Sequence, residues 1–574
     1  MHIRLFLSLL AGLCLLGPAV GAQDVVDPVF NFDKIYHDPL DVKLIKPSEE
    51  NGLVVEQLEY TAEVYQGKPV RIFAVLAYPK GGKNLPAIYW SQGGMYEAGS
   101  FWPLTWAAKG YMCINVTLPH DIYNSFVRFT TERPEDGNLA HLALAQMRGI
   151  TLLTQRPEVD ATRIGVGGTS YGGFFASLIA GADPRVKAGM SFFTTGEHKL
   201  GTGYRQFTQL RTTDEVGIWS GTIDPAWRLK RKAAPFLWAV ASDDHWMHLP
   251  AAIKTYQDSI GEKRLAIAPN WYHAFPVNVD QELIDWFDVY LMKTRKPYNK
   301  PSALEVKNVD GVLKASWNWT GDNPAKKAEL VVAYGRTRPW HDGWLYRYHY
   351  AIPAKIKGNT ATAKIPVPER GLEMLAYGNL TDDHDVLTST EPVTVQPEEL
   401  KITRLAKLTL NTALMADFSA AEIEFFSRHN GETLPGKTDK EVKQAGEQSL
   451  RANGTVELKL GHIPGHSHKL ALWLRAEKPA TIRVSVRASA PACWQMHIVD
   501  ILRRQQPDSP DIAYENIKPP VYTADVKVDT TWKEYTLDCP FDGTPIEGYN
   551  LSVVPTGGAA TYWLDTISFT PQWK

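Results

Sequence analysis

Cysteine is scarce in this chain, with 4 residues in 574, and neither sign of charge dominates, since 61 Lys and Arg residues face 63 Asp and Glu residues. A balanced charge produces no large electrostatic field, which argues against nucleic acid or an anionic membrane as the main partner. The apolar run at the N-terminus is too short to span a bilayer. We therefore expect no nucleic-acid binding and no integral membrane association.

The N-terminal segment has the pattern of an export signal. Residues 1–22 begin with a basic stretch, continue with an apolar run and end in small residues placed for cleavage before Gln23. Cys14 follows Leu13 and not a small residue, so we expect no lipid anchor. The pattern predicts a secreted or periplasmic protein.

Three cysteines remain after the expected cleavage. Cys113 lies in the apolar segment GYMCINV, which is typical of a buried strand with an inert thiol. An exported protein permits a disulfide between Cys493 and Cys539, but nothing in the sequence brings these two residues together. Their pairing stays open at this stage.

The length of the chain requires more than one domain, because single hydrophobic cores stop growing near ~250–300 residues. From residue 23 to 297, short apolar strands alternate with helical stretches, which is typical of a mostly parallel sheet covered by helices. Residues 301–397 change to short alternating runs separated by turn residues, which favours a small β-sandwich of immunoglobulin or fibronectin type.

The last segment, residues 400–574, is again rich in predicted strands separated by turn residues. A second sandwich is the natural solution for such a pattern. The order of HKLALWLRAE, TIRVSVRA, WKEYTLDCPF and TYWLDTISF resembles the jelly-roll modules found beside polysaccharide-degrading enzymes. That resemblance implies a carbohydrate-binding-like module.

The strongest chemical signal is Gly168-Thr169-Ser170-Tyr171-Gly172, which follows the predicted strand RIGVGG and precedes an apolar helix. This is the context of a G-x-S-x-G nucleophile elbow. A serine that projects from a tight strand-to-helix turn needs glycine two positions before and after it, where a Cβ would collide with the adjoining elements. Ser170 is thus the candidate nucleophile.

A serine hydroxyl becomes a good nucleophile only when a base takes its proton, and a carboxylate must hold that base. His273 meets the requirement, because it follows the apolar strand RLAIA and precedes the last helix, which brings it to the same sheet edge as Ser170. The other histidines lie in the loop that must supply the acid or stand in the wrong chain order or element: His245, His248, His120, His141 and His198.

The acid should come from the segment PFLWAVASDDHWMHLP, which contains Asp243 and Asp244. The segment resembles the acid loop of α/β-hydrolases, in which the aspartate stands three positions after the small residue that ends the strand, and an apolar residue stands three positions later. Counting from Ala241 favours Asp244, with Met247 at the apolar position. Asp243 is the alternative acid, and the aspartate that is not the acid is expected to cap the loop.

An oxyanion that develops on the substrate needs two backbone N–H donors. The N–H of Tyr171 is one, since it directly follows the nucleophile at a helix N-terminus. The second is expected from the loop Ser91-Gln92-Gly93-Gly94-Met95, and the sequence leaves it open between Gly94 and Met95. Gln92 stands where esterases with a His-Gly-Gly type motif have histidine.

The catalytic region resembles the acetyl xylan esterase and dienelactone hydrolase-like branch of the α/β-hydrolases, and it is also close to prolyl oligopeptidase-type peptidases. The resemblance covers about half of the chain and rests on PEVDATRIGVGGTSYGG, ASDDHWMHLP and Tyr272-His273. It implies an α/β-hydrolase fold over residues 23–297, an acyl-enzyme on Ser170, and no metal or organic cofactor.

Substrate choice depends on the stretch between the elbow and the acid, which carries Tyr204, Arg205, Arg211, Trp219 and Trp227. These side chains suit an anionic sugar, or they are solvated arginines and packed tryptophans. We expect a secreted serine esterase acting on a polysaccharide or oligosaccharide ester. One alternative is a serine peptidase of prolyl oligopeptidase type, although the stretch between Gln23 and the first predicted strand is too short for the propeller domain that usually precedes the catalytic domain in such enzymes. The other alternative is a non-catalytic polysaccharide-binding protein. Acyl group, sugar and oligomeric state stay open.

Overall fold

The computed structural model describes residues 27–572, with gaps at 95–96, 124–132, 195, 198–199, 201–212, 232–233, 245, 272, 274–281, 335–347, 407–412, 420–435, 455, 459–479, 500–520, 540–549 and 558–560. The expected signal peptide lies outside the described residues.

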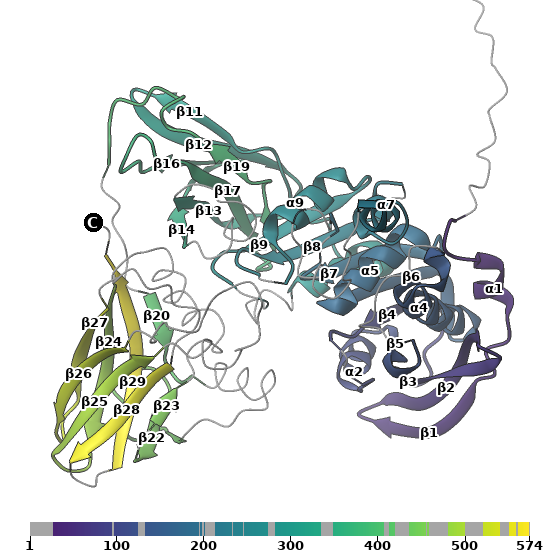
Figure 1. The fold of residues 1–574 in the computed structure, drawn as a ribbon, viewed down its shortest axis with the longest axis horizontal. Helices are drawn as coiled ribbons and strands as arrows, with labels where there is room; N and C mark the ends of the chain where they lie inside the picture. Colours follow the sequence, from purple (N-terminus) through teal and green to yellow (C-terminus); the bar gives the residue numbers. More distant parts are fainter. Residues whose placement is uncertain are drawn as a thin grey trace, which may run out of the picture.

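The first part of the chain is built on a 9-stranded sheet with the order β1-β2-β3-β5-β4-β6-β7-β8-β9 (Figure 1). Strands β4 to β9 run parallel, and β1 to β3 join them antiparallel. Counted from β2, this is the strand order of the α/β-hydrolase fold, as the sequence predicted. The strands are β1 (Lys43–Glu50), β2 (Leu53–Tyr65), β3 (Lys68–Pro79), β4 (Leu85–Ser91), β5 (Met112–Val116), β6 (Val159–Thr169), β7 (Val186–Phe192), β8 (Phe236–Ala241) and β9 (Lys263–Ala268).

Helices cover both faces of this sheet. Neighbouring residues of a strand point to opposite faces. On β4, Trp90 stacks on Trp102 of α2, whereas a Cβ on Gly149 of α4 would meet the ring of Tyr89 at 2.7 Å. Helices α2 and α4 therefore lie on opposite faces. The helical elements are α1 (Phe32–His37), α2 (Phe101–Ala108), α3 (His120–Tyr123), η1 (Pro134–Asp136), α4 (Asn138–Gln155), α5 (Tyr171–Ala182), α7 (Thr213–Thr222), α8 (Pro225–Leu229), α9 (Leu249–Asp258) and η3 (Asp288–Met292).

Two antiparallel sheets follow and enclose a core of their own. In β12 the burial alternates, with Trp317 and Trp319 inside and Asn318 outside, which is typical of a sandwich strand. This confirms a β-sandwich after the hydrolase region. Its strands are β10 (Lys300–Pro301), β11 (Glu305–Val309), β12 (Val312–Thr320), β13 (Ala325–Tyr334), β14 (His349–Pro353), β15 (Lys355–Lys357), β16 (Thr360–Ile365), β17 (Met374–Asp382), β18 (Leu387–Ser389) and β19 (Val393–Val395).

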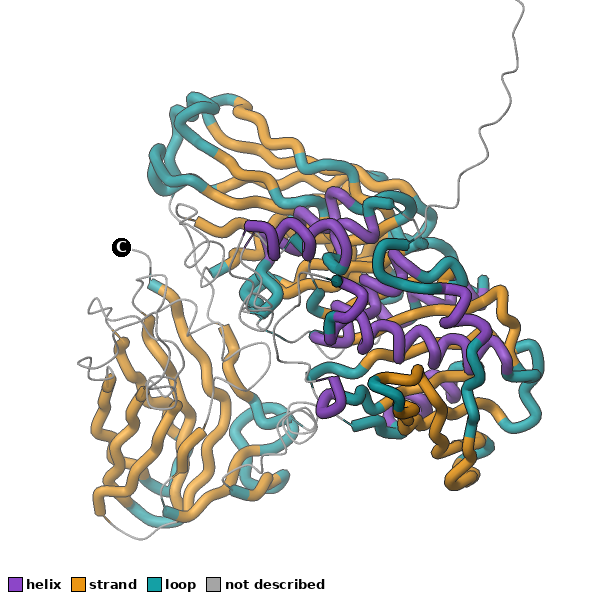
Figure 2. Tube along the Cα trace, turned by 45° about the vertical axis from the view of Figure 1, so that its right-hand side comes forward, coloured by secondary structure: helices purple, strands orange, loops and turns teal. Residues whose placement is uncertain are grey.

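The C-terminal part also consists of two antiparallel sheets around a separate core, and Figure 2 shows strands and loops there among the described residues. The predicted strand LALWLRAE lies outside the described residues. The strands are β20 (Ala413–Ala416), β21 (Lys437–Asp439), β22 (Ser449–Asn453), β23 (Val456–Leu458), β24 (Ala480–Ala488), β25 (Ala492–Val499), β26 (Val521–Val528), β27 (Lys533–Cys539), β28 (Asn550–Gly557) and β29 (Thr561–Pro571).

The hydrolase core continues into the first sandwich. Val331, Tyr377, Val386 and Leu387 of that sandwich belong to the same buried apolar cluster as the hydrolase residues. Strand β18 lies against β9, the last strand of the hydrolase sheet. These two parts of the chain thus share a hydrophobic core, in addition to the core inside the sandwich.

The three cysteines of the described part are unpaired. Cys493 lies in β25 of one C-terminal sheet and is exposed, whereas Cys539 lies in β27 of the other sheet and is buried. The disulfide that the sequence left open does not form. Burial raises the pKa of the Cys113 thiol well above its usual range, in line with the expected inert thiol. No helix among the described residues is long and apolar enough to cross a membrane.

Candidate active site

Ser170 stands on a sharp turn between β6 and α5. Its backbone has φ 58° and ψ −121°, a conformation that side-chain-bearing residues rarely adopt. The turn is fixed by the Ser170 N–H, which donates to the carbonyl of Phe192 at 2.8 Å. Because β6 and β7 are parallel neighbours, this bond ties the elbow to the end of the adjoining strand. The strand, strained serine and helix have the order that the motif predicted.

The glycines around Ser170 are required by close backbone contacts. A Cβ on Gly172 would lie 2.1 Å from the carbonyl oxygen of Ser91, and a Cβ on Gly168 would lie 2.4 Å from the carbonyl oxygen of Gly172. Backbone atoms at these distances cannot move aside cheaply. The motif glycines therefore allow the elbow to pack directly against the end of β4.

Ser170, His273 and Asp244 form a hydrogen-bonded chain. The Oγ of Ser170 is 2.6 Å from Nε2 of His273, and Nδ1 of His273 is 2.8 Å from Oδ2 of Asp244. The Asp244 side chain is fully buried, and that of His273 is 17% exposed. Phe193 packs beside the imidazole with ring centroids 4.9 Å apart. The structure thus brings together the three residues that the sequence proposed as nucleophile, base and acid.

The two adjacent aspartates have different partners. Oδ1 of Asp244 accepts hydrogen bonds from the N–H groups of Trp246 and Met247 at 2.8 and 2.9 Å, which leaves Oδ2 for His273. Asp243 accepts a hydrogen bond from the hydroxyl of Ser242, and its N–H donates to the carbonyl of Trp271 at 3.0 Å. Asp244 therefore faces His273, whereas Asp243 contacts its own loop and the backbone of Trp271, so the residue that counting from Ala241 favoured is the one placed beside His273.

The candidate oxyanion donors surround Ser170 from two sides. Tyr171 is the first residue of α5, so its N–H lies at the helix N-terminus, where the dipole favours negative charge. The loop after β4 passes against the elbow, since a Cβ on Gly93 would lie 3.5 Å from the Cβ of Ser170. Gly94 follows in that loop with φ 57°, and Met95 lies outside the described residues.

Polar side chains of β5 and α4, which no sequence motif had indicated, hold the loop that follows β4. Asn115 of β5 donates from Nδ2 to the carbonyl of Trp90 at 2.9 Å and to Oε1 of Gln92 at 3.3 Å. Ser91 donates to Oε1 of the buried Gln146 of α4 at 2.6 Å. Gln92, the departure from the His-Gly-Gly type motif, thus has a partner inside the protein. No sequence spacing signalled these contacts, because they join elements far apart in the chain.

The other candidate histidines lie elsewhere in the structure. The ring of His120 lies 6.0 Å from that of Tyr171, and burial lowers its pKa while Asp121 opposes the shift. His141 pairs with Glu63 at 2.7 Å, and His248 is a buried residue that precedes α9. His245 and His198 lie outside the described residues. None of the described three joins the chain of Ser170, His273 and Asp244.

The substrate-side stretch is only partly described. Trp219 is 1% exposed and donates from Nε1 to Asp224 at 3.2 Å, and Trp227 packs against the guanidinium groups of Arg228 and Arg231. Trp219 is therefore packed inside the protein, whereas Trp227 is half-buried, and the choice between the two interpretations of this stretch stays open. Tyr204, Arg205 and Arg211 lie outside the described residues.

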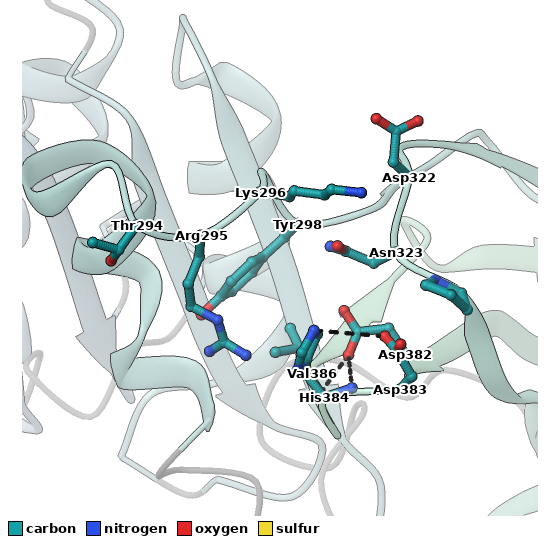
Figure 3. A pocket seen from close by; sticks show the side chains of 11 residues that line it. Thr294, Arg295, Lys296, Tyr298, Asp322, Asn323, Asp382, Asp383, His384 and Val386 are labelled. Carbon is teal, nitrogen blue, oxygen red and sulfur yellow. Dashed lines mark hydrogen bonds and ion pairs between the residues drawn. The ribbon is translucent and has the colours of Figure 1, made fainter.

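A cavity of about 300 Å³ lies between the end of the hydrolase region and two loops of the first sandwich (Figure 3). Its walls carry charges of both signs, and none of its lining residues belongs to the chain of Ser170, His273 and Asp244. Asp382, one of them, accepts hydrogen bonds from the N–H groups of His384 and Val386, both at 3.0 Å. Within the described part of the chain, no group of three His, Cys, Asp or Glu side chains is placed to hold a metal ion.

Solved structures similar to this chain include several hydrolases. Acetyl xylan esterase from Paenibacillus sp. R4 is 19% identical, with 44% of this chain and 90% of that chain covered and a TM-score of 0.39. Acetyl xylan esterase 1 from Thermoanaerobacterium sp. JW/SL YS485 is also 19% identical, with coverage of 46% and 94% and a TM-score of 0.37. Pyrococcus horikoshii acylaminoacyl peptidase is 17% identical, with coverage of 44% and 51% and a TM-score of 0.33. No family model and no curated protein matches the chain.

Proposed function

We propose that the protein is an exported serine carboxylic-ester hydrolase that acts on esters of a polysaccharide or oligosaccharide. The observation that carries the hydrolase assignment is the chain from Ser170 Oγ through His273 to the buried Asp244, with distances of 2.6 and 2.8 Å. Nucleophile and base within hydrogen-bond reach, with a third group that orients the base, are the arrangement that activates a hydroxyl.

The reaction follows from these contacts. Oγ of Ser170 attacks the ester carbonyl while Nε2 of His273 takes the proton of the Ser170 hydroxyl. The N–H groups of Tyr171 and of the loop that contains Gly94 stabilise the oxyanion. The alcohol leaves with the proton from His273. A water molecule, deprotonated by His273, then attacks the acyl-enzyme, and the bond to Ser170 breaks as His273 returns the proton to Oγ of Ser170. Asp244 accepts three hydrogen bonds, so it is held rigidly and keeps the proton of the imidazole on Nδ1.

Export and the carbohydrate substrate are supported by the sequence. Residues 1–22 have the pattern of a cleaved signal, and two sandwich regions follow the hydrolase region in the chain. The resemblance of the last segment to jelly-roll modules beside polysaccharide-degrading enzymes favours a sugar ester over a lipid or peptide. It also assigns the C-terminal sandwich a carbohydrate-binding role.

A substrate panel tests the proposal. Wild type and Ser170→Ala are assayed on p-nitrophenyl acetate, acetylated xylan and a prolyl-anilide peptide. We expect release of p-nitrophenol and acetate by wild type, and a fall in kcat of about 10⁶-fold for Ser170→Ala, the order found when such a nucleophile is removed. Cleavage of the peptide without cleavage of either ester would identify a peptidase. Binding of xylan without turnover would favour a non-catalytic protein.

A further inference from the structure

The first sandwich covers the open edge of the hydrolase sheet. Strand β9 is the last strand of that sheet, so backbone groups on its outer side have no neighbouring strand of the same sheet. At Ile267 the sandwich satisfies both groups: the N–H donates to Oγ of Ser389 at 2.9 Å, and the carbonyl accepts from Nδ2 of Asn379 at 3.2 Å. Ser389 in turn donates to Oδ1 of Asn379 at 2.7 Å.

Two residues after β9, Asn270 extends this contact toward the site. Its side chain clamps the backbone of His349, the first residue of β14: Nδ2 donates to the His349 carbonyl at 2.8 Å, and the His349 N–H donates to Oδ1 at 2.7 Å. Asn270 has φ 60° and is 4% exposed. The amide therefore pairs with β14 as one residue of a neighbouring strand would.

The other side of the same segment is held by the loop that carries the acid. The N–H of Ser242 donates to the carbonyl of Ala268 at 3.0 Å, and the N–H of Asn270 donates to Oγ of Ser242 at 2.8 Å. The N–H of Asp243 donates to the carbonyl of Trp271. The segment that leads to His273 is thus fixed between the acid loop and β14.

The side chain of His349, whose backbone pairs with Asn270, contacts Tyr377 in the shared core. The Nδ1 of His349 and the hydroxyl of Tyr377 are 3.2 Å apart, and Tyr377 is fully buried in the shared core. Burial, reinforced by the nearby Asp243, raises the pKa of Tyr377 well above its usual range, so the hydroxyl keeps its proton. The line from Tyr377 through His349 to Asn270 therefore joins the shared core to the segment that leads to His273.

We propose that Asn270 is a positioning residue for His273 and that strand β14, through it, makes the first sandwich a structural part of the active site. The proposal rests on the proposed function, because it assigns His273 the role of base. A misplacement of the base by about 1 Å is enough to reduce the rate by about 100-fold. Loss of the clamp should therefore affect the proton transfer by His273 more than the binding of substrate.

The test compares three variants of the full-length protein. Asn270→Gly removes the amide and tolerates the positive φ, whereas Tyr377→Phe removes only the hydroxyl beneath His349. Asn323→Ala is the matched control, since Asn323 is a buried asparagine at the same junction whose Nδ2 donates to the carbonyl of Pro297 at 3.0 Å (Figure 3 shows Asn323 in the wall of the polar cavity). It has no contact with the segment that leads to His273 among those described.

Each variant is measured for kcat and KM on p-nitrophenyl acetate and for the rate at which a fluorophosphonate labels Ser170. We expect Asn270→Gly to lower kcat and the labelling rate by about 10- to 100-fold with KM changed less than about twofold. Tyr377→Phe should lower kcat by about two- to fivefold, and Asn323→Ala should keep kcat even where it lowers the melting temperature.

The outcomes separate the two levels of the argument. If wild type is not labelled at all, the proposed function fails, and the role of Asn270 fails with it. If wild type is labelled but Asn270→Gly and Tyr377→Phe keep kcat and the labelling rate, positioning by β14 is wrong and the serine hydrolase assignment stands. An equal loss of kcat in Asn323→Ala would show that any weakening of the contact between the hydrolase region and the sandwich lowers the activity. It would overturn the specific role of Asn270.

Discussion

Ser170 lies on a turn whose fit depends on adjacent residues, whereas His273 lies on a loop whose position depends on residues far away in the chain. Glycines two positions on either side of Ser170 allow the elbow to touch the backbone of Ser91, inside the hydrolase sheet. The segment before His273 is held through Asn270 by His349, which belongs to the sandwich. One half of the site is therefore local, and the other half depends on a second structural unit.

The largest expected effect distinguishes the two aspartates of the acid loop. Asp244→Asn should lower kcat by about 10⁴-fold, because an amide can donate to Nδ1 of His273 and hold the imidazole in the wrong tautomer. Asp243→Asn should lower kcat less than about tenfold, since Asp243 contacts Ser242 and the backbone of Trp271. Steady-state kinetics on p-nitrophenyl acetate measure both. A larger loss for Asp243→Asn would reassign the acid.

The second prediction tests the local half of the site. Gly172→Ala places a methyl group 2.1 Å from the carbonyl oxygen of Ser91. We expect kcat/KM to fall by about 100-fold or more, and the free energy of unfolding to fall by about 1–3 kcal/mol, the usual cost of overpacking. Chemical denaturation and ester kinetics provide the two values.

The matched control for this change is Gly217→Ala on the exposed side of α7 (Thr213–Thr222), where an added Cβ meets nothing within 4 Å. Alanine in a helix interior is favoured over glycine by about 1 kcal/mol, so this variant should be as active as wild type and slightly more stable. Equal activity of Gly172→Ala and Gly217→Ala would contradict the close contact between Gly172 and the backbone of Ser91.

The smallest expected effect on kcat comes from the core that the hydrolase region shares with the first sandwich, where a substitution should change stability and not the chemistry. Leu387→Ala removes a side chain of that core and should lower the free energy of unfolding by about 2 kcal/mol or more. Urea unfolding, monitored through the loss of esterase activity, should have its midpoint at a lower urea concentration than in wild type. Leu537→Ala, in the separate C-terminal core, should leave that midpoint unchanged. A lower midpoint for Leu537→Ala but not for Leu387→Ala would contradict the assignment of Leu387 to the core of the hydrolase region.

The same contrast explains how far the sequence alone predicts this protein. The elbow at Ser170 depends on spacing within one segment and the parallel sheet on alternation along the chain, so both could be inferred from the printed residues, whereas the preference for Asp244 also needed the pattern of related enzymes. The contacts of Asn270 with His349 and of Gln92 with Asn115 join residues 79 and 23 positions apart, and no local pattern encodes such pairs. The second oxyanion donor stays a prediction, since Met95 is not described.

The most direct test of the central claim is to find the residue that a fluorophosphonate modifies. The full-length protein is labelled, digested and analysed by mass spectrometry, with Ser170→Ala and His273→Ala treated in parallel. We expect a single adduct on the peptide that contains Ser170, no adduct there in Ser170→Ala, and labelling that is slower by several orders of magnitude in His273→Ala. Labelling at another residue, or at an unchanged rate without His273, would contradict that central claim.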